Sequence, residues 1–325
     1  MDVLSIIEKA NSRALSQRKR RNVRSVAAAL DKFGKRTGLD QPHRMAHYLA
    51  QLAHESMGFH HDKEIWGPTA AQKRYEGRRD LGNTQPGDGK RFSGRGPIQI
   101  TGRHNYRVFS AWAKRLDRSA PDFEVQPEAV NTDPWEGLAP IWYWDEGNPT
   151  SKSLNRFADQ NDIEMVTRRI NGGLNGYSDR QDWYVRIALV MNGFGPKDVE
   201  TFQRAAGLTV DGIAGSKTRG ALHRSLVALS SIVSEDVRDA PVVHEIERRT
   251  VPPKVEEKVE EKSRPFEWLT GLFGVGGGAG AMIFGMPWQT AAIVFGAAIV
   301  TLLILIIFRR QIIGAVRDVR REVEG

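Results

Sequence analysis

The stretch from Arg91 to Tyr106, RFSGRGPIQITGRHNY, constrains the fold more than any other part of the sequence. Its glycines permit sharp turns and a close approach of a ligand to the backbone. The alternation from Ile98 to Thr101 predicts a short strand-like segment, with isoleucines on one face and an amide and a hydroxyl on the other. Such a face suits a sugar, and a polar hairpin whose side chains satisfy one another is an equal alternative.

The chain has 325 residues, which is room for one domain of ordinary size plus appendages. Its formal net charge of +8 favours an anionic partner such as nucleic acid, acidic lipid or the bacterial wall. Charge alone does not choose among these, and we predict no nucleic-acid binding. There is no cysteine, so disulfides and thiolate metal sites are excluded.

The two ends of the chain differ in character. Residues 1–39 read as a basic helical segment, and we expect no secretory signal, because the basic run Arg18 to Arg21 follows a mixed polar segment. No residue from Trp268 to Phe308 is charged, and Thr290 to Phe308 is long and apolar enough to span a bilayer. The sequence therefore predicts a chain that contacts a membrane.

Two membrane topologies fit this pattern. A single span would place the residues before it on the opposite side of the membrane from the basic tail. A hairpin of Trp268 to Met286 and Thr290 to Phe308 would put Arg264 and Arg309 on the same side, as the positive-inside rule prefers. We favour the hairpin.

A helix is predicted from a cap at Asp40, with Pro42 in its first turn, to about Met57. Glu55 falls at the edge of the apolar stripe of this helix, beside Tyr48. A carboxyl that is half sheltered by apolar neighbours resists ionisation, and a general acid needs that property. An exposed helical glutamate is the alternative.

Two further carboxylates, Glu64 and Glu76, lie in the loop-rich segment from His60 to Lys90. Either one could act with Glu55, and either could instead pair with one of the nearby arginines. Glu64 is the closer of the two to Glu55 in sequence.

Several separated motifs agree on a family: His54-Glu55, Arg74 to Thr84 (RYEGRRDLGNT), the opening stretch, and Ile170 to Arg180 (INGGLNGYSDR). From Asp40 to Gly193 the chain resembles glycoside hydrolase family 19, whose chitinase-like fold is also used by many bacteriophage endolysins. The resemblance implies a mainly α, lysozyme-like, bilobal domain with a small β-hairpin region.

The resemblance also implies an inverting mechanism, in which one carboxylic acid protonates the leaving oxygen and a second carboxylate activates water. It makes Glu55 the acid and Glu76, in the YEGR run, the base. Thr101, where the plant enzymes usually have serine, would help to hold the water. The remaining matched positions would bind the sugar or, for the arginine, organise the carboxylates: Gln99, Asn105, Asn171 and Arg180. No metal or other cofactor is expected.

Val199 to Leu222 resembles the second half of a small helical peptidoglycan-binding module, whose first half is not recognisable. A remnant that no longer binds is the alternative. The expected organisation is a basic segment 1–39, a catalytic domain 40–194, a partial binding module 195–232, a charged flexible linker 233–266, a transmembrane region 267–308 as one helix or a hairpin, and a basic tail 309–325.

We interpret the chain as a phage or prophage endolysin that hydrolyses β-1,4 glycosidic bonds of peptidoglycan for host lysis. Its expected partners are peptidoglycan and the bacterial inner membrane, and the sequence predicts no oligomeric state. A chitinase on the same site is one alternative. A non-catalytic glycan-binding membrane tether is another, against which the presence of both Glu55 and Glu76 argues.

Overall fold

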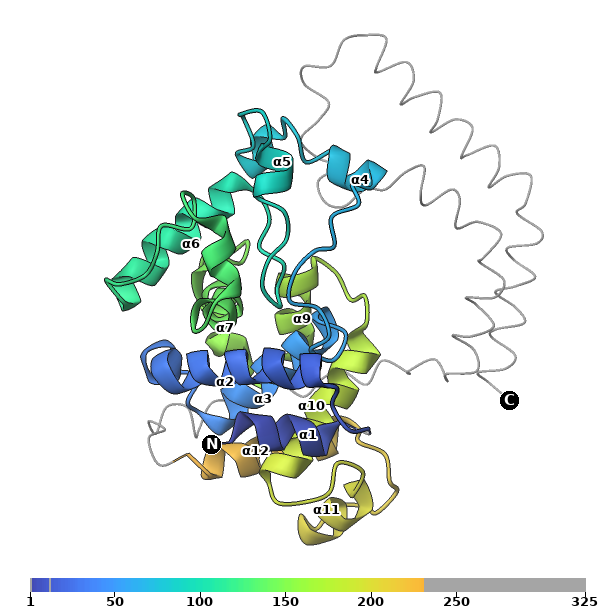
Figure 1. Cartoon of the computed structure of the whole chain (residues 1–325). Helices are drawn as coiled ribbons and strands as arrows, with labels where there is room; N and C mark the ends of the chain where they lie inside the picture. The colour runs from blue at the N-terminus through green and yellow to red at the C-terminus, as the bar shows by residue number, and fades with distance from the viewer. Residues whose placement is uncertain (1, 12, 231–325) are drawn as a thin grey trace, which may run out of the picture. The chain divides into compact units, whose positions relative to one another are not determined.

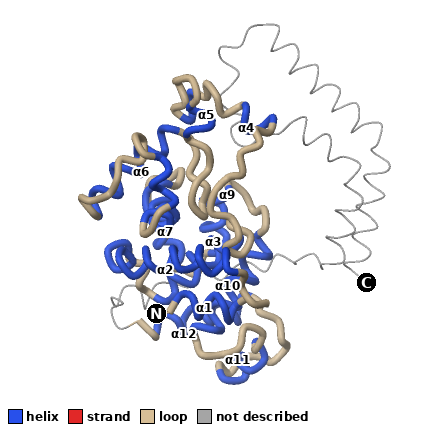
Figure 2. Tube along the Cα trace, viewed as in Figure 1, coloured by secondary structure: helices blue, strands red, loops and turns tan. Residues whose placement is uncertain are grey.

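The structure, a computed structural model, describes residues 2–11 and 13–230. Within these ranges the chain forms helices joined by turns and loops (Figure 2), in agreement with the predicted mainly helical class. The longer helices are α1 (Val3–Ala10), α2 (Gln17–Thr37), α3 (Pro42–Glu55), α6 (Arg103–Leu116), α7 (Trp135–Trp142), α9 (Ile163–Asn171), α10 (Tyr177–Met191), α11 (Val199–Ala205) and α12 (Ser216–Ala228). Shorter turns are α4 (Ala70–Lys73), η1 (Arg79–Leu81), α5 (Asp88–Arg91), η2 (Pro127–Asn131), η3 (Tyr143–Gly147) and α8 (Asn155–Ala158).

Helix α3 is the centre of the packing. Its residues from Pro42 to Ala53 are nearly all buried, and it packs against α10, α12, α8 and α9. Helix α1 contacts both α2 and α10, and α2 lies along α7. The approach of α2 to α7 is close, since a side chain at Gly137 would meet the Ser25 carbonyl oxygen. This arrangement fixes the end of α3, where Glu55 lies, from several sides.

The region of α4 and α5 stands apart from α1, α3, α10 and α12, and long loops connect it to them (Figures 1 and 2). Helix α4 contacts α5, and η1 contacts α6. The loop-rich character expected for residues 60–90 is therefore found, with short turns of helix within it.

The start of α3 corrects one prediction. The cap is Gln41, not Asp40, and its side chain makes no capping hydrogen bond. Pro42 occupies the first turn, and a proline keeps the preceding residue extended, so Gln41 with ψ of 126° is the last residue outside the helix.

The predicted β-hairpin region is also wrong: no strand is assigned in the described ranges. Only isolated bridges join Lys63 to Arg95 and Arg95 to Ile100. Gln99 has a φ of +56°, which is the left-handed region, so the alternation of Ile98 to Thr101 does not continue as extended chain.

The expected membrane localisation is corrected as well. From residue 2 to 230, leaving out residue 12, no helix is both long and apolar enough to cross a bilayer. The longest, α2, has 21 residues, but many of them are arginine or lysine. The segments 233–266, 267–308 and 309–325, on which the linker and membrane predictions rest, lie outside the described residues.

Helices α11 and α12 follow the chain reversal after Gly195. The buried amide of Gln203 joins them: it donates to Asp211, Thr218 and the Ile213 carbonyl, and accepts from the amides of Asp211 and Gly212. Helix α12 then packs on α3 and α10, with Leu222 and Leu226 fully buried. The second helix of the segment that resembles a binding module, α12, is thus packed into the same helical assembly as α3.

Candidate active site

Glu55 is the last residue of α3, and its carboxylate is held by the buried guanidinium of Arg180 from α10. The Arg180 Nη2 atom lies 2.5 Å from Glu55 Oε1. The arginine side chain is fully buried, whereas the glutamate side chain keeps 28% of its surface exposed. A buried arginine is stabilised mainly by the carboxylate that it contacts. The pair therefore orients a carboxylate that solvent and a ligand can still reach.

Two further polar side chains, those of Gln51 and Thr167, help to hold Arg180 in place. Its Nη1 donates to Gln51 Oε1 at 2.5 Å, and the amide of Gln51 donates to Thr167 Oγ1 at 3.1 Å. Gln51 lies one helical turn before Glu55, so that both side chains share a face of α3. The sequence reasoning missed Gln51, although this i−4 spacing could have indicated it.

The loop that carries Asn171 is fixed beside the same helix end. Asn171 ends α9 and is exposed. At the far end of the loop, His54 Nδ1 lies 2.7 Å from Asp179 Oδ2, and the His54 ring covers Gly176 so closely that a Cβ there would lie 2.1 Å from the ring. Gly176 has a φ of +67°, which also favours glycine. His54 and Asp179 thus tie the loop to α3.

The predicted wall residues Gln99, Thr101 and Asn105 form one chain of contacts. Thr101 Oγ1 donates to the Gln99 carbonyl at 2.9 Å, and Asn105 Nδ2 donates to the Thr101 carbonyl at 2.8 Å. The turn closes through paired backbone bonds between Arg95 and Ile100 at 3.1 and 2.8 Å. All three side chains remain half-buried, so the structure brings them together on one short segment.

Glu64 lies against this wall. Its Oε2 accepts from the Gly94 amide at 2.9 Å, and its own amide donates to the Gly94 carbonyl at 2.9 Å. A Cβ at Gly94 would lie 2.7 Å from Gln99 Oε1 and 3.3 Å from Glu64 Oε2. Gln72 Nε2 and the Tyr75 hydroxyl donate to the other carboxylate oxygen at 3.0 and 3.4 Å. Glu64 and Gln99 therefore converge on one glycine.

Glu76 is bonded elsewhere. Its two oxygens accept from the amides of Gly87 and Gly89 at 2.6 and 2.8 Å, at the start of α5. Backbone amides at a helix start are a usual place for a carboxylate, because four of them lack partners within the helix. This contact gives Glu76 a capping role in the structure.

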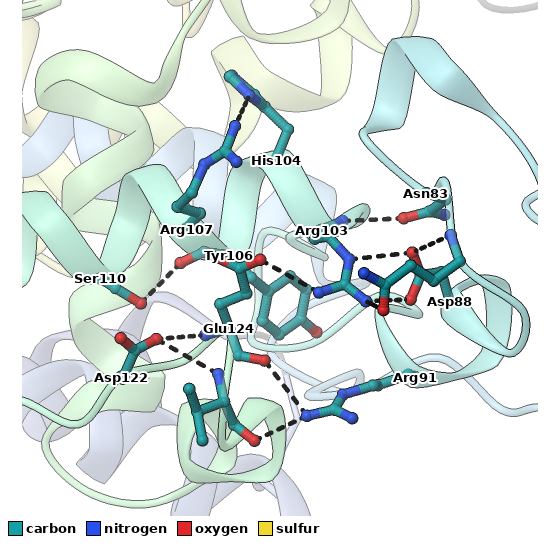
Figure 3. A network of polar contacts seen from close by, with 12 residues as sticks. Asn83, Asp88, Arg91, Arg103, His104, Tyr106, Arg107, Ser110, Asp122 and Glu124 are labelled. Atoms are coloured by element: carbon teal, nitrogen blue, oxygen red, sulfur yellow. Dashed lines mark hydrogen bonds and ion pairs between the residues drawn. The ribbon is translucent and has the colours of Figure 1, made fainter.

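The turn that binds Glu76 is anchored to α6 by Arg103 (Figure 3). The guanidinium of Arg103 contacts both oxygens of Asp88, at 2.9 and 2.5 Å, and Glu124 at 3.1 Å. These contacts lower the pKa of the Asp88 carboxyl from its ordinary value, chiefly through the hydrogen bond from Arg103. The same guanidinium lies 4.7 Å from the centre of the Phe92 ring. Arg103 thus joins α5 to the helix that follows the wall.

A pocket lies between the end of α3, the wall turn and α9. Its lining includes Gln51 and Leu52 from α3, Ile98 from the wall, and Ile170, the neighbour of Asn171; Tyr48, Pro140, Tyr143 and Trp144 complete it. Its empty volume of about 240 Å³ includes space open to solvent. The pocket shows that the wall turn faces the helix of Glu55.

The chain is similar to several known proteins. The chain is 33% identical, over 198 residues, to a glycosyl hydrolase family 19 domain-containing protein of Haemophilus influenzae; the match covers 52% of this chain and 91% of that protein. An endochitinase of Arabidopsis thaliana is 31% identical over 146 residues, which is 45% of each protein. Residues 197–222 match the family of peptidoglycan binding domains.

Two solved structures are similar at lower identity. Chitinase C from Streptomyces griseus has a TM-score of 0.45 and 19% identity, over 60% of this chain and 79% of that chain. The class IV chitinase of family 19 from Zea mays has a TM-score of 0.42 and 17% identity, over 60% and 94%.

The relatives define a glycoside hydrolase of chitinase type. The chain belongs to glycosyl hydrolase family 19, and it carries a peptidoglycan-binding segment at residues 197–222.

Proposed function

We propose that the protein hydrolyses β-1,4 glycosidic bonds of bacterial peptidoglycan, with Glu55 as the general acid. The observation that carries this proposal is the contact between buried Arg180 and half-exposed Glu55. A general acid must be held at a fixed position beside the leaving oxygen, and a buried guanidinium with its own support from Gln51 supplies that rigidity.

For the second carboxylate we favour Glu64. It borders Gln99 at Gly94, on the wall that carries Thr101 and Asn105. The hydrogen bonds that it accepts from Gly94, Gln72 and Tyr75 hold both carboxylate oxygens in place beside the wall, and a base that activates water needs such a fixed position. Glu76, the choice from sequence, stays a prediction, and its contacts with Gly87 and Gly89 support a structural role.

The proposed sugar contacts keep the roles predicted for them. Gln99, Asn105 and Asn171 would bind the substrate, and Thr101 would hold the attacking water between the wall and the carboxylates. An inverting reaction needs room for that water, with the two carboxyl groups roughly 6.5–9.5 Å apart. The configuration of the first product, read by NMR during hydrolysis, tests inversion directly.

Two features support peptidoglycan as the substrate. Residues 197–222 match a peptidoglycan-binding domain, and the formal net charge of +8 complements an anionic wall. An enzyme of this specificity in a phage or prophage would serve host lysis as an endolysin, which is the biological role that we propose. The likeness to an endochitinase favours chitin as the second candidate substrate.

Digestion of purified murein and of chitin oligosaccharides by the full-length protein tests the proposal. We expect soluble muropeptides, identified by mass spectrometry, and a loss of about 100-fold or more in kcat for Glu55→Gln, since general acid catalysis typically contributes that much. Glu8→Gln is the matched control, because Glu8 is a surface residue that pairs with Arg20. Chitin cleavage without released muropeptides would select the chitinase, and full activity of Glu55→Gln would reject Glu55 as the acid.

A further inference from the structure

Gln72, in the short helix α4, has a buried side chain to which the proposed reaction assigns no part. Only 4% of the residue is exposed. Its Oε1 accepts hydrogen bonds from the backbone amides of Gly67 and Thr69, at 3.0 and 2.8 Å. Its Nε2 donates to Glu64 Oε1 at 3.0 Å and to the Ile65 carbonyl at 2.8 Å. One amide side chain therefore joins the start of α4 to the proposed base.

These contacts fix the direction in which the Gln72 amide points. Its oxygen faces two donors, and both hydrogens on its nitrogen are used by acceptors. A flipped amide would set its oxygen against Glu64 and the Ile65 carbonyl, so the four contacts would be lost together. Backbone groups thus hold the donor that faces Glu64 in place.

Half of this network is a capping box. Thr69 Oγ1 accepts from the Gln72 amide at 3.2 Å, while the Gln72 side chain accepts from the Thr69 amide. Glutamate and glutamine both serve in the last position of such a box, because each offers an oxygen to the cap amide. Only glutamine also supplies a donor, and a glutamate would set a second carboxylate against Glu64. The contact with Glu64 therefore requires glutamine, whereas the cap does not.

Glu64 and the segment after α4 are also held from the side of the wall. Glu64 Oε2 accepts from the Gly94 amide at 2.9 Å, so each carboxylate oxygen has a donor of its own. The buried Asn83 donates to the Tyr75 carbonyl at 2.9 Å and accepts from the Arg103 amide at 2.9 Å. The segment that carries the donor to Glu64 is thus tied to α6, the helix that follows the wall.

We propose that Gln72 is a positioning residue, which orients the carboxylate of Glu64 beside the wall and must be glutamine to do so. This inference rests on the proposed function for the role of Glu64 as the base. A base that activates water must keep one oxygen at a fixed point, and a displacement of about 1 Å can cost on the order of 100-fold in rate. Gln72 acts on the reaction through Glu64 and not through contact with the sugar.

Two substitutions in the full-length protein separate the two roles of Gln72. Gln72→Glu keeps the oxygen that caps α4 and replaces the donor to Glu64 by a second carboxylate. Thr69→Val, the matched control, removes the hydroxyl of the capping box and leaves that donor in place.

Both variants are assayed on the substrate that the wild type cleaves, whether murein or chitin oligosaccharides. We expect kcat to fall about 10-fold or more in Gln72→Glu, with little change in KM, and to stay within about 2-fold of the wild type in Thr69→Val. A wild-type kcat in Gln72→Glu, or an equal loss in Thr69→Val, overturns the proposal.

A double variant shows whether the effect passes through Glu64. In the Glu64→Gln background the base is already absent, so adding Gln72→Glu should cost no further activity. The exchange of amide and carboxylate also restores a hydrogen bond in the reverse direction. The double variant should therefore recover the few degrees of melting temperature that Gln72→Glu alone loses. A further loss of about 10-fold in kcat would show that Gln72 acts apart from Glu64, and would overturn the proposal.

The recovery of melting temperature does not depend on turnover. If the protein cleaves neither murein nor chitin, the proposed function is rejected, and this recovery still shows whether the side chains of Gln72 and Glu64 orient each other. Its absence would overturn the proposal.

A further variant, Gln72→Met, covers the case in which Gln72→Glu does not fold, because it brings no second charge. It loses both the cap and the donor, so its kcat should fall about 10-fold below that of Thr69→Val, which loses a capping contact only. Equal kcat values for these two variants overturn the proposal.

Discussion

Arg180 is fully buried, and its guanidinium reaches Glu55 and Gln51 on α3, which lie 125 and 129 residues earlier in the chain. The contact joins α10 to α3, the two helices at the centre of the packing. One residue therefore contributes both to the stability of the helix pair and to the orientation of the proposed acid.

Replacement of Arg180 by glutamine tests this double role. We expect a loss of about 1–3 kcal/mol in the free energy of unfolding, because the buried oxygen of Gln51 loses its donor, whereas Glu55 can still reach solvent. Turnover should fall by about 100-fold or more in the fraction that remains folded. Urea unfolding and single-turnover kinetics measure the two effects. Arg180→Lys keeps the charge but loses the two-pronged contact, and should be intermediate.

A pair of matched substitutions distinguishes the two candidate bases, Glu64 and Glu76. Glu64→Gln should reduce kcat by about 100-fold or more, because its carboxylate borders the wall, and should also lower the melting temperature by a few degrees, because it accepts hydrogen bonds from Gly94, Gln72 and Tyr75. Glu76→Gln should lower the melting temperature by a few degrees, since the capping contacts to Gly87 and Gly89 weaken, and should retain most of the activity. The opposite pattern would restore Glu76 as the base.

The packing of α12 predicts different effects for two leucines on the same helix end. Leu226 is fully buried against the core, whereas Leu229 is 53% exposed. Leu226→Ala should destabilise the protein by about 2–5 kcal/mol, which is the usual range for a buried leucine. Leu229→Ala should stay within about 0.5 kcal/mol of the wild type. Equal effects in denaturant titrations would show that α12 does not share the core of α3.

Acid should weaken the same interface through His223. Burial, followed by the charge of His43, lowers the pKa of His223 from 6.5 to about 3. The folded state thus prefers the neutral ring, so this contribution is complete above the unfolded pKa of 6.5 and is lost as the pH falls towards 3. Between about pH 7.5 and pH 5 this single group should cost about 2 kcal/mol.

The variant His223→Gln checks this origin. A glutamine cannot gain a proton, so the difference in unfolding free energy between the two pH values should shrink by about 2 kcal/mol. His104→Gln is the matched control, because His104 is exposed on α6. An unchanged pH dependence in His223→Gln would assign the acid sensitivity to other groups.

Local sequence patterns predicted the helical class and placed Glu55 on a helix next to its apolar stripe. They failed where tertiary contacts decide the conformation. The alternation at Ile98 to Thr101 is that of a strand, yet Gln99 adopts a positive φ because the Arg95–Ile100 pair closes a tight turn. Pro42 moved the start of α3 by one residue.

The partners of the carboxylates could not be predicted from spacing alone. Glu64 meets Gly94 thirty residues later, and this pairing depends on how the 60–90 loop folds back on the wall. Sequence likeness in the YEGR run favoured Glu76. Its contact with the Gly87 amide becomes visible only in the folded structure. The expected domain boundaries stay predictions. The local sequence pattern also did not indicate that Leu222 and Leu226 are buried against α3 and α10.

The shared core of α12 has a mechanical consequence. A glycan bound at α12 would lie at a set position relative to Glu55, because α12 packs on α3, the helix that ends at Glu55. The bound part of the glycan and the bond that is cleaved would then keep a constant distance and direction from each other. The distance between the binding segment and the catalytic residues would then select which bond of the glycan strand is cleaved.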